Sequence, residues 1–257
     1  MCLFHCFAER KREVCIRNLK MIIEYDGTDF AGWQRQDGAV STVQGEIEAV
    51  LRMILQEAVS ITGAGRTDKG VHAMGQAASF MTGSSMEAGR LCHSLNSLLP
   101  SSIRIISLID VDADFHARYS ALSRQYRYML RQRESAIFRR FSGYDRAPHD
   151  LDLLNSRASV LLGRHDFKAF SKSGSDTRTT CCTVSEAQWS RDKEYLVFQI
   201  SANRFLRSMV RYLVSATLRF SGAEISHALV SRQPLKGLLP ADPAGLFLWE
   251  IGYASAG

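Results

Sequence analysis

Residues 18–27 read NLKMIIEYDG, a run in which apolar side chains alternate with others up to an Asp-Gly pair. Alternation with a period of two is typical of a strand with one buried face, and Asp-Gly is typical of the turn that ends it. A loop follows, and residues 43–55 then carry apolar side chains at helical spacing. Ser41 and Gln44 have the spacing of a capping box before that helix. The chain is therefore expected to begin with a strand, a loop and an amphipathic helix.

The remainder of the first half contains two further predicted strands and a predicted helix. Apolar patterns predict strands at residues 76–81 and 103–111. A helix between them is expected to be capped by Ser84, with Glu87 three residues later. No helical pattern separates residues 103–111 from the next strand, at residues 123–131.

The second half repeats strands and helices in a similar mixture. Its expected strands are residues 123–131, 184–191, 194–202 and 246–253, and its expected helices are one capped at Asp150 and a long one at residues 204–220. Strands follow strands without intervening helices, so an α+β architecture fits better than a doubly wound parallel sheet. We expect a mobile arm at residues 1–17 and two α+β domains at residues 18–112 and 113–257.

Strand 123–131, SRQYRYMLR, has two chemically different faces. Its alternation places Tyr126 and Tyr128 on one face, and Gln125 and Arg127 on the other. A strand face with two tyrosines is expected to be exposed or to line a site.

The 257-residue chain has a formal net charge of +6, and 25 of its 32 basic residues are Arg. Arginine binds phosphates through paired hydrogen bonds and stacks on bases. The positive net charge and the excess of arginine over lysine therefore favour a polyanionic partner, although a bias toward Arg codons would give the same count. Eight Arg and two acidic residues lie at residues 118–146, interleaved with aromatic residues, and a second Arg group lies at residues 204–219. Such surfaces are typical of single-stranded or loop RNA binding. The candidates for RNA contact are Arg118, Arg124, Arg127, Arg204 and Arg207.

Targeting and cysteine patterns point to the cytoplasm. No run of about 18 apolar residues predicts a membrane span, and the basic residues near the start follow the apolar ones, opposite to a secretory signal. The six cysteines form no C-x-x-C pair and have no zinc-like His spacing. We expect reduced thiols, no metal and no membrane association.

The segment GAGRTDKGVHA, residues 63–73, has three glycines around Arg66 and Asp68. The glycines allow a tight loop that presents the carboxylate of Asp68. The segment lacks the P-loop frame, and the chain has no H-E-x-x-H or G-x-S-x-G motif. By itself, an Asp in a Gly-rich loop is more often a turn-former than a catalyst.

GRTDKGVHA resembles the catalytic loop of the tRNA pseudouridine synthase A (TruA) family. Further segments are similar to that family in the same order: YDGTDFAGWQRQ at 25–36, TVQ at 42–44, DFHARYSALSRQYRY at 114–128, NRFLRSMVR at 203–211 and AGLFLWEIGY at 244–253. The resemblance spans residues 19–253. It implies a pseudouridine synthase fold of two similar α/β halves that share a continuous, mainly antiparallel sheet flanked by helices, with a central basic cleft.

The resemblance also implies an isomerase that converts uridine to pseudouridine in the tRNA anticodon stem-loop (positions 38–40), without a cofactor, as a homodimer that holds the anticodon arm. Carried over by residue, Asp68 is the essential carboxylate, Arg66 extrudes the target nucleotide, and Tyr126 packs on its base. Arg211 pairs with Asp68, and Leu246 supplies an apolar wall. Uracil must leave C1′, rotate and reattach through C5, which requires a flipped base and an ionised carboxylate.

One departure from the family pattern lies just before the expected strand at residues 184–191, where the family commonly carries an Arg. This chain has Cys182 there, and Arg178 lies four residues earlier. Two alternatives to the synthase remain. A non-catalytic RNA-binding protein of the same fold would bind without turnover, and a base-releasing or strand-cleaving hydrolase would leave free uracil or shortened RNA.

Overall fold

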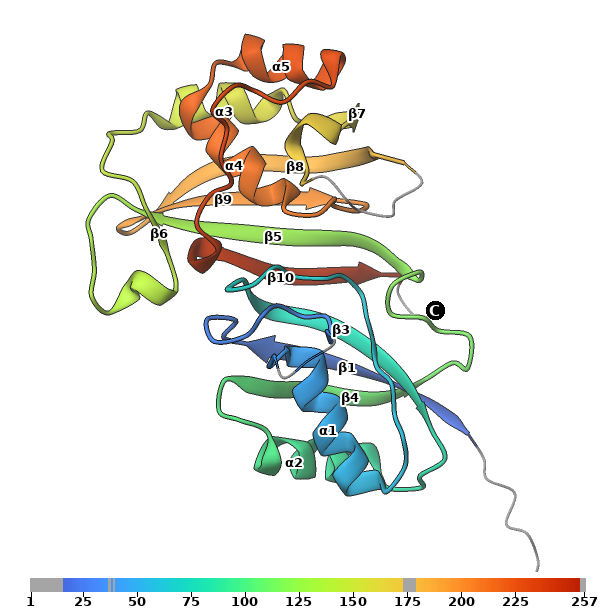
Figure 1. The fold of residues 1–257 in the computed structure, drawn as a ribbon. Helices are drawn as coiled ribbons and strands as arrows, with labels where there is room; N and C mark the ends of the chain where they lie inside the picture. Colours follow the sequence, from blue (N-terminus) through green and yellow to red (C-terminus); the bar gives the residue numbers. More distant parts are fainter. Residues whose placement is uncertain (1–15, 37, 39, 173–178, 255–257) are drawn as a thin grey trace, which may run out of the picture.

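One sheet runs through the described part of the protein (Figure 1), and it contains ten strands. The structure is a computed structural model that describes residues 16–36, 38, 40–172 and 179–254. The strand order is β4-β1-β3-β10-β5-β9-β8-β7, with β2 beside β3 and β6 beside β5. Residues 1–15 of the expected N-terminal arm and Arg178 lie outside the described residues.

The first half of the chain supplies the lower elements of Figure 1. Its elements are β1 (Arg17–Tyr25), α1 (Val43–Leu55), β2 (Thr62–Gly63), β3 (His72–Thr82), α2 (Ala88–Leu98) and β4 (Ile103–Val111). The expected strands at residues 18–25 and 103–111 are confirmed, and β3 extends further toward its start than the expected strand at residues 76–81.

The second half supplies the remaining strands and three helices. Its strands are β5 (Ala121–Arg131), β6 (Gly143–Tyr144), β7 (Gly163–Asp166), β8 (Cys181–Asp192), β9 (Tyr195–Ala202) and β10 (Leu246–Tyr253). Its helices are α3 (Leu151–Ser159), α4 (Met209–Arg219) and α5 (Gly222–Ser231), and the short 3-10 turns of the chain are η1 (Phe138–Arg140), η2 (Lys168–Phe170) and η3 (Pro243–Gly245).

Strand β10 joins the two halves into one sheet. It pairs in parallel with β3 through Phe247 and His72, and antiparallel with β5 along most of its length. The other pairings along the main path are antiparallel. The continuous, mainly antiparallel sheet expected from the sequence is therefore confirmed.

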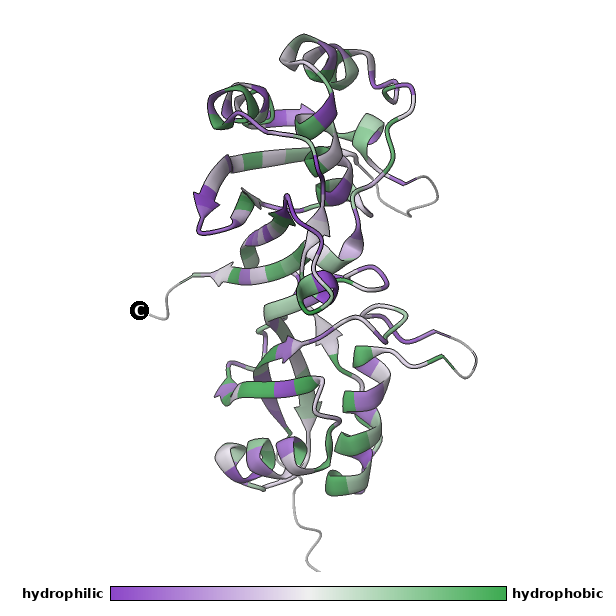
Figure 2. Cartoon of the chain, turned by 90° about the vertical axis from the view of Figure 1, so that its left-hand side faces the viewer, coloured by the Kyte–Doolittle hydropathy of each residue, from purple (hydrophilic) through white to green (hydrophobic). Residues whose placement is uncertain are grey.

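Alternation along the strands separates a buried face from an open one. In β1, Leu19, Met21 and Ile23 are fully buried, whereas Lys20 and Ile22 between them are half-buried. In β5, Tyr126, Tyr128 and Leu130 are buried in the same alternating way. Figure 2 shows this alternation of hydrophilic and hydrophobic residues along the chain. Tyr126 and Tyr128 are therefore not exposed, and both belong to the packed face.

Two helix caps differ from the sequence-based expectation. The N-cap of α1 is Thr42, whose hydroxyl accepts from the N–H of Gly45 at 3.2 Å, while the hydroxyl of Ser41 contacts Glu46. The N-cap of α2 is Glu87, whose carboxylate accepts from two backbone N–H groups of the first turn. Ser84 lies before that helix and bonds locally to Met86. The cap at Asp150 is confirmed.

The expected long helix is shorter at its start. Helix α4 begins at Met209 rather than at residue 204, so the three arginines of residues 204–211 do not share one helix face. The preceding segment is held by backbone contacts, because Asn203 pairs with Thr183 of β8 and the carbonyl of Arg207 accepts from Lys172. These long-range hydrogen bonds fix residues 203–208 in a non-helical path.

Helix α5 was not predicted, although its start has the sequence pattern of a capping box. Ser221 and Glu224 form a full capping box, and Ile225, Ala228 and Leu229 are buried at helical spacing. Within the part of the chain that the structure describes, no helix is long and apolar enough to cross a membrane.

Shortening a core side chain of β10 should weaken the whole sheet. Leu248 is completely buried beside both β3 and β5. We expect Leu248→Ala to lower the free energy of unfolding by about 2–5 kcal/mol because it leaves a cavity. Chemical denaturation checks this, with Val230→Ala on the surface of α5 as a control that changes stability by less than about 0.5 kcal/mol. Equal losses in both variants would contradict the central role of β10.

Candidate active site

The Gly-rich segment forms a loop between β2 and β3. The backbone N–H of Ala64 donates to Ala77 of β3, and the amide of Gln76 donates to the carbonyl of Gly65 at 2.8 Å. The carbonyl of Asp68 accepts from Val71, which closes a turn. The first two contacts anchor the start of the loop to β3, and the third closes the loop on itself. Arg66 is exposed, whereas Asp68 is half-buried.

Glycines allow this loop to pack closely. A Cβ at Gly63 would lie 2.5 Å from the indole nitrogen of Trp33, and Gly70 has a φ of +77° beside Pro243. Neither position tolerates a larger residue without movement. The carbonyl of Thr67 also accepts from the N–H of Trp33, and the hydroxyl of Thr67 bonds to that of the buried Tyr25 at 2.8 Å. Residues 63–71 are thus held by the first loop of the chain as well as by β3.

Asp68 meets two groups from the start of α4. The hydroxyl of Ser208 donates to its Oδ2 atom at 2.6 Å, and a terminal guanidinium nitrogen of Arg211 lies 3.6 Å from the same oxygen. The carboxylate remains partly accessible, with 27% of its side chain exposed. The Nε of Arg211 donates to the carbonyl of Ala241 at 2.6 Å, which fixes the guanidinium. The expected Asp68–Arg211 pair is therefore present in the structure.

Ser208 is a site residue that sequence reasoning missed. It is the N-cap of α4, and its backbone adopts a left-handed φ of 59°. Non-glycine residues rarely adopt this conformation outside functional or tightly packed positions. Nothing in the local pattern NRFLRSMVR distinguishes this serine, because its partner Asp68 is 140 residues away.

Tyr126 lies close enough to Asp68 for the charge of the carboxylate to act on its phenol. Burial raises the pKa of its phenol above the ordinary value, and the negative charge of Asp68 raises it further, so the ring stays neutral. Its ring meets Phe205 edge-on at 5.1 Å. Tyr126 pairs with Leu248 and Tyr128 pairs with Leu246, so all four side chains share one sheet face. The structure thus brings Asp68, Tyr126 and Arg211 together, with buried Leu246 in the adjoining wall.

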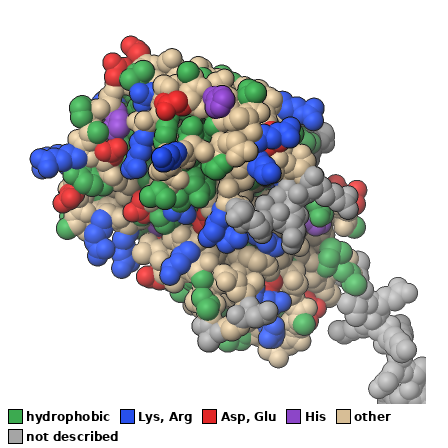
Figure 3. Space-filling view, turned by 45° about the horizontal axis from the view of Figure 1, so that its top comes forward, with side chains coloured by type: hydrophobic (Ala, Val, Ile, Leu, Met, Phe, Trp, Pro, Cys, Tyr) green, Lys and Arg blue, Asp and Glu red, His purple; other side chains and the backbone are tan. Residues whose placement is uncertain are grey.

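The predicted RNA-contacting arginines separate into different environments. Arg66, Arg118 and Arg207 are exposed, and Lys69 beside Asp68 is exposed as well. Arg204 is half-buried. Figure 3 shows that Lys and Arg side chains recur across one face of the molecule, among hydrophobic ones.

Two of these arginines make their contacts within the protein. Arg127 lies on the opposite sheet face from Tyr126 and stacks on Trp249 at 4.0 Å. Arg124 is on the same face as Tyr126, but its guanidinium donates to four carbonyls of the protein itself. Neither set of contacts supports the expectation that these two residues bind RNA.

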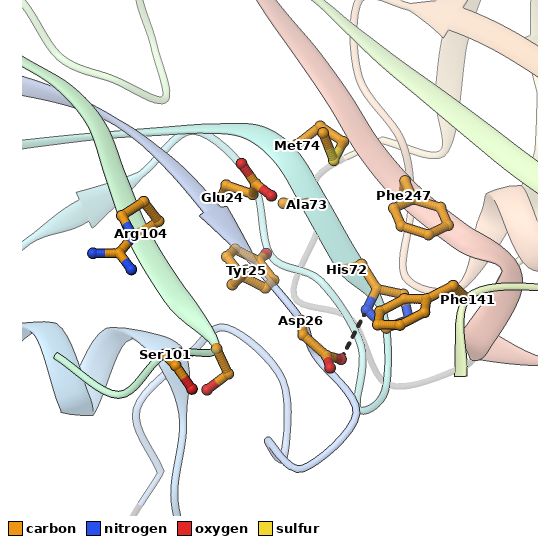
Figure 4. Close-up of a pocket in the computed structure, with 11 residues that line it drawn as sticks. Glu24, Tyr25, Asp26, His72, Ala73, Met74, Ser101, Arg104, Phe141 and Phe247 are labelled. Carbon is orange, nitrogen blue, oxygen red and sulfur yellow. Dashed lines mark ion pairs between the residues drawn. The ribbon is translucent and has the colours of Figure 1, made fainter. Parts of the chain in front are cut away.

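His72, directly after the loop, lines a cavity of about 260 Å³ together with Asp26, Phe141 and Phe247 (Figure 4). Its Nδ1 accepts from the N–H of Gly27 at 3.0 Å and lies 3.2 Å from a carboxylate oxygen of Asp26. The ring stacks on Phe247 and tilts against Phe141. Burial lowers the pKa of His72 below its ordinary value of 6.5, although the charge of Asp26 opposes this.

The described residues contain no group of three or more His, Cys, Asp or Glu side chains placed to hold a metal ion. Cys92, Cys181 and Cys182 are free thiols. Cys182, in place of the expected Arg, is buried in the core, and burial raises its pKa to about 11. It therefore stays uncharged at neutral pH and supplies no positive charge to an RNA.

Comparison with known proteins identifies the family of this chain. The family model described as tRNA pseudouridine synthase matches residues 21–120 and 158–254. The tRNA pseudouridine synthase A of Pelodictyon phaeoclathratiforme is 53% identical over 243 residues, covering 93% of this chain and 100% of its own length. That of Chlorobaculum tepidum is 52% identical, covering 92% and 98%. That of Acetivibrio thermocellus is 38% identical, covering 93% and 100%. The chain therefore belongs to the tRNA pseudouridine synthase family, as its motifs indicated.

His72 should make folding sensitive to mild acid. Its pKa is lower in the folded protein than in the unfolded chain, so the unfolded chain binds the extra proton first. The contribution to stability is present above about pH 6.5 and is lost as the pH falls toward the lowered folded value. We expect His72→Asn to flatten the loss of thermal midpoint between pH 7 and 5. His227→Asn, at an exposed position, should keep the wild-type slope; an unchanged slope in His72→Asn would contradict the assignment.

Proposed function

We propose that this chain isomerises uridine to pseudouridine in the anticodon stem-loop of tRNA, with Asp68 as the essential carboxylate. The observation that carries the proposal is the convergence on Asp68 of Ser208, Arg211 and Tyr126. The family membership supports the reaction type. The exposed Arg66 and Lys69 beside the carboxylate support a polyanionic substrate.

The environment of Asp68 suits a reacting carboxylate. A hydroxyl donor and a guanidinium on one oxygen, Oδ2, favour the ionised form and orient the group. The other oxygen has no protein partner among the hydrogen bonds of the described residues. Attack on C1′ of the target nucleotide and removal of the C2′ proton both need a free ionised oxygen.

Tyr126 supplies the wall for a flipped base. Its ring is fixed by β5, β9 and Phe205, and its phenol stays neutral beside the carboxylate. Stacking on such a ring keeps detached uracil in place until it reattaches through C5. Arg66, which is exposed on the same loop as Asp68, fits the role of holding the target nucleotide out of its helix.

The larger arrangement is proposed on the same basis. We assign residues 18–112 and 113–257 to two domains, with the boundary after β4, and place the tRNA between them near β10. A homodimer in the cytoplasm, holding the anticodon arm across both subunits, completes the proposal.

Replacing the carboxylate should stop the reaction without stopping binding. We expect Asp68→Asn to lower turnover of an unmodified tRNA transcript by more than about 100-fold, because the carboxylate takes part in chemistry. Carbodiimide primer extension detects pseudouridine as new stops in the anticodon arm. Asp192→Asn, at an exposed end of β8, is the matched control and should keep full activity.

The outcomes separate the three candidate functions. Stops with wild type and the control, but not with Asp68→Asn, support the synthase. Bound tRNA without stops in any protein would favour a non-catalytic RNA-binding protein. Free uracil or shortened RNA would favour a hydrolase. Wild-type turnover by Asp68→Asn would refute the catalytic assignment.

Affinity for tRNA should fall steeply with added salt. Exposed arginines that neutralise phosphates release counterions from the RNA. We expect Arg207→Gln to reduce the slope of log affinity against log salt by about 1. Arg191→Gln, at the exposed end of β8, should leave the slope unchanged. Filter binding at several salt concentrations checks this, and a flat response of the wild type would remove the electrostatic explanation of binding.

A further inference from the structure

Arg124 uses its guanidinium as a cross-link between separate backbone segments. One terminal nitrogen donates to the carbonyls of Ala121 at 2.9 Å and Asn203 at 2.8 Å. The other donates to the carbonyls of Ala64 at 3.1 Å and Arg118 at 2.7 Å. A planar guanidinium presents its donors in a fixed fork, so four such contacts fix the position of each acceptor relative to the others.

The partners of Arg124 are all neutral carbonyls. No carboxylate pairs with it among the ion pairs of the described residues. The side chain is half-buried, and burial lowers its pKa from the ordinary value. A partly desolvated cation needs its donors satisfied, and hydrogen bonds from an ionised donor are stronger than neutral ones. The four carbonyls supply that compensation inside the protein, which leaves these donors unavailable to a phosphate.

The acceptors lie on the segments that build the site. Ala64 is in the loop that carries Asp68, four residues before it. Asn203 opens the non-helical segment that leads to Ser208, the hydroxyl donor to Asp68. Arg118 is in the exposed link between β4 and β5. Arg124 itself is two residues before Tyr126 on β5 and shares its sheet face.

We infer that Arg124 is a positioning residue for the reaction, which holds the Asp68 loop against the Ser208 segment and the Tyr126 strand. This inference rests on the proposed function. Asp68 and Ser208 are far apart in the chain, so their 2.6 Å hydrogen bond depends on how the two segments are placed. The hydrogen bonds of Arg124 reach the backbone of both segments. Arg124 acts through these backbone contacts and does not touch the RNA.

Replacing Arg124 should therefore reduce chemistry and leave RNA affinity unchanged. Lysine keeps the positive charge, but its single nitrogen cannot donate to all four carbonyls that the planar guanidinium of arginine reaches. We expect Arg124→Lys to lower the single-turnover rate at saturating enzyme by about 10- to 100-fold, because small misplacement of a reacting group has effects of that size. The dissociation constant for tRNA should stay within about 2-fold of wild type, with an unchanged salt slope.

Arg157 offers a matched control. It is a half-buried arginine whose guanidinium also donates to two backbone carbonyls, of Thr217 and Leu218, away from the Asp68 loop. Arg157→Lys should lower the thermal midpoint but leave the single-turnover rate unchanged when both are measured well below that midpoint. In Arg124→Ala, millimolar guanidinium ion should restore part of the rate, since the ion can occupy the space left by the side chain and donate to the same carbonyls. The ion should not restore the rate of Asp68→Asn.

The possible results are distinct. Loss of rate in Arg124→Lys with unchanged affinity, together with guanidinium rescue of Arg124→Ala, supports the inference. Weaker binding with a salt slope reduced by about 1 would instead make Arg124 a phosphate contact and overturn it. A wild-type rate in a folded Arg124→Lys would also overturn it, leaving a role in stability alone. Failure of the proposed function looks different, because the wild type itself would then form no pseudouridine.

Discussion

The pairing of β10 between β3 and β5 is the constraint on which the rest of the structure depends. Strand β10 comes last in the chain, yet it occupies the centre of the sheet and pairs with both halves. Without it, β3 and β5 would be the edges of two separate sheets, and their unpaired backbone groups would be exposed. The Asp68 loop enters β3, and Tyr126 lies on β5, so this one strand sets the distance between the carboxylate and the ring.

The site is completed by side chains that connect segments remote in sequence. Ser208 and Arg211 reach Asp68 from the start of α4, and Arg124 ties the backbone of both segments to β5. Each of these contacts involves an ionised group, and the hydrogen bonds of Ser208 to Asp68 and of Arg124 to Ala64 are part-buried, where hydrogen bonds are stronger than at the surface. A carboxylate held this way is pre-oriented before substrate arrives, which is the arrangement that positional catalysis requires.

The basic residues of the chain serve more than one purpose, although they look alike in the sequence. Arg66, Arg118 and Arg207 are exposed, while Arg127 covers Trp249 on the far face and Arg131 pairs with Glu194 at the end of β5. A count of arginines therefore exceeds the number of arginines whose side chains are exposed. The acid sensitivity expected of His72 arises from its burial, which lowers its pKa in the folded protein.

Local sequence determined most of the longer strands and helices, though not α5, as well as the tight Gly-rich loop around Asp68 and the family to which the chain belongs, because side-chain periodicity and glycine content act over a few residues. Sequence patterns placed the start of α4 too early, because they do not show that Asn203 pairs with Thr183 across the chain. They also misassigned two helix caps; at α1, for example, Thr42 is the cap in place of the neighbouring Ser41. They could not identify Ser208, or separate Arg124 from Arg118. The tertiary structure alone decided these roles, since a hydroxyl or guanidinium chooses partners by distance in space, and no local pattern encodes a neighbour 140 residues away.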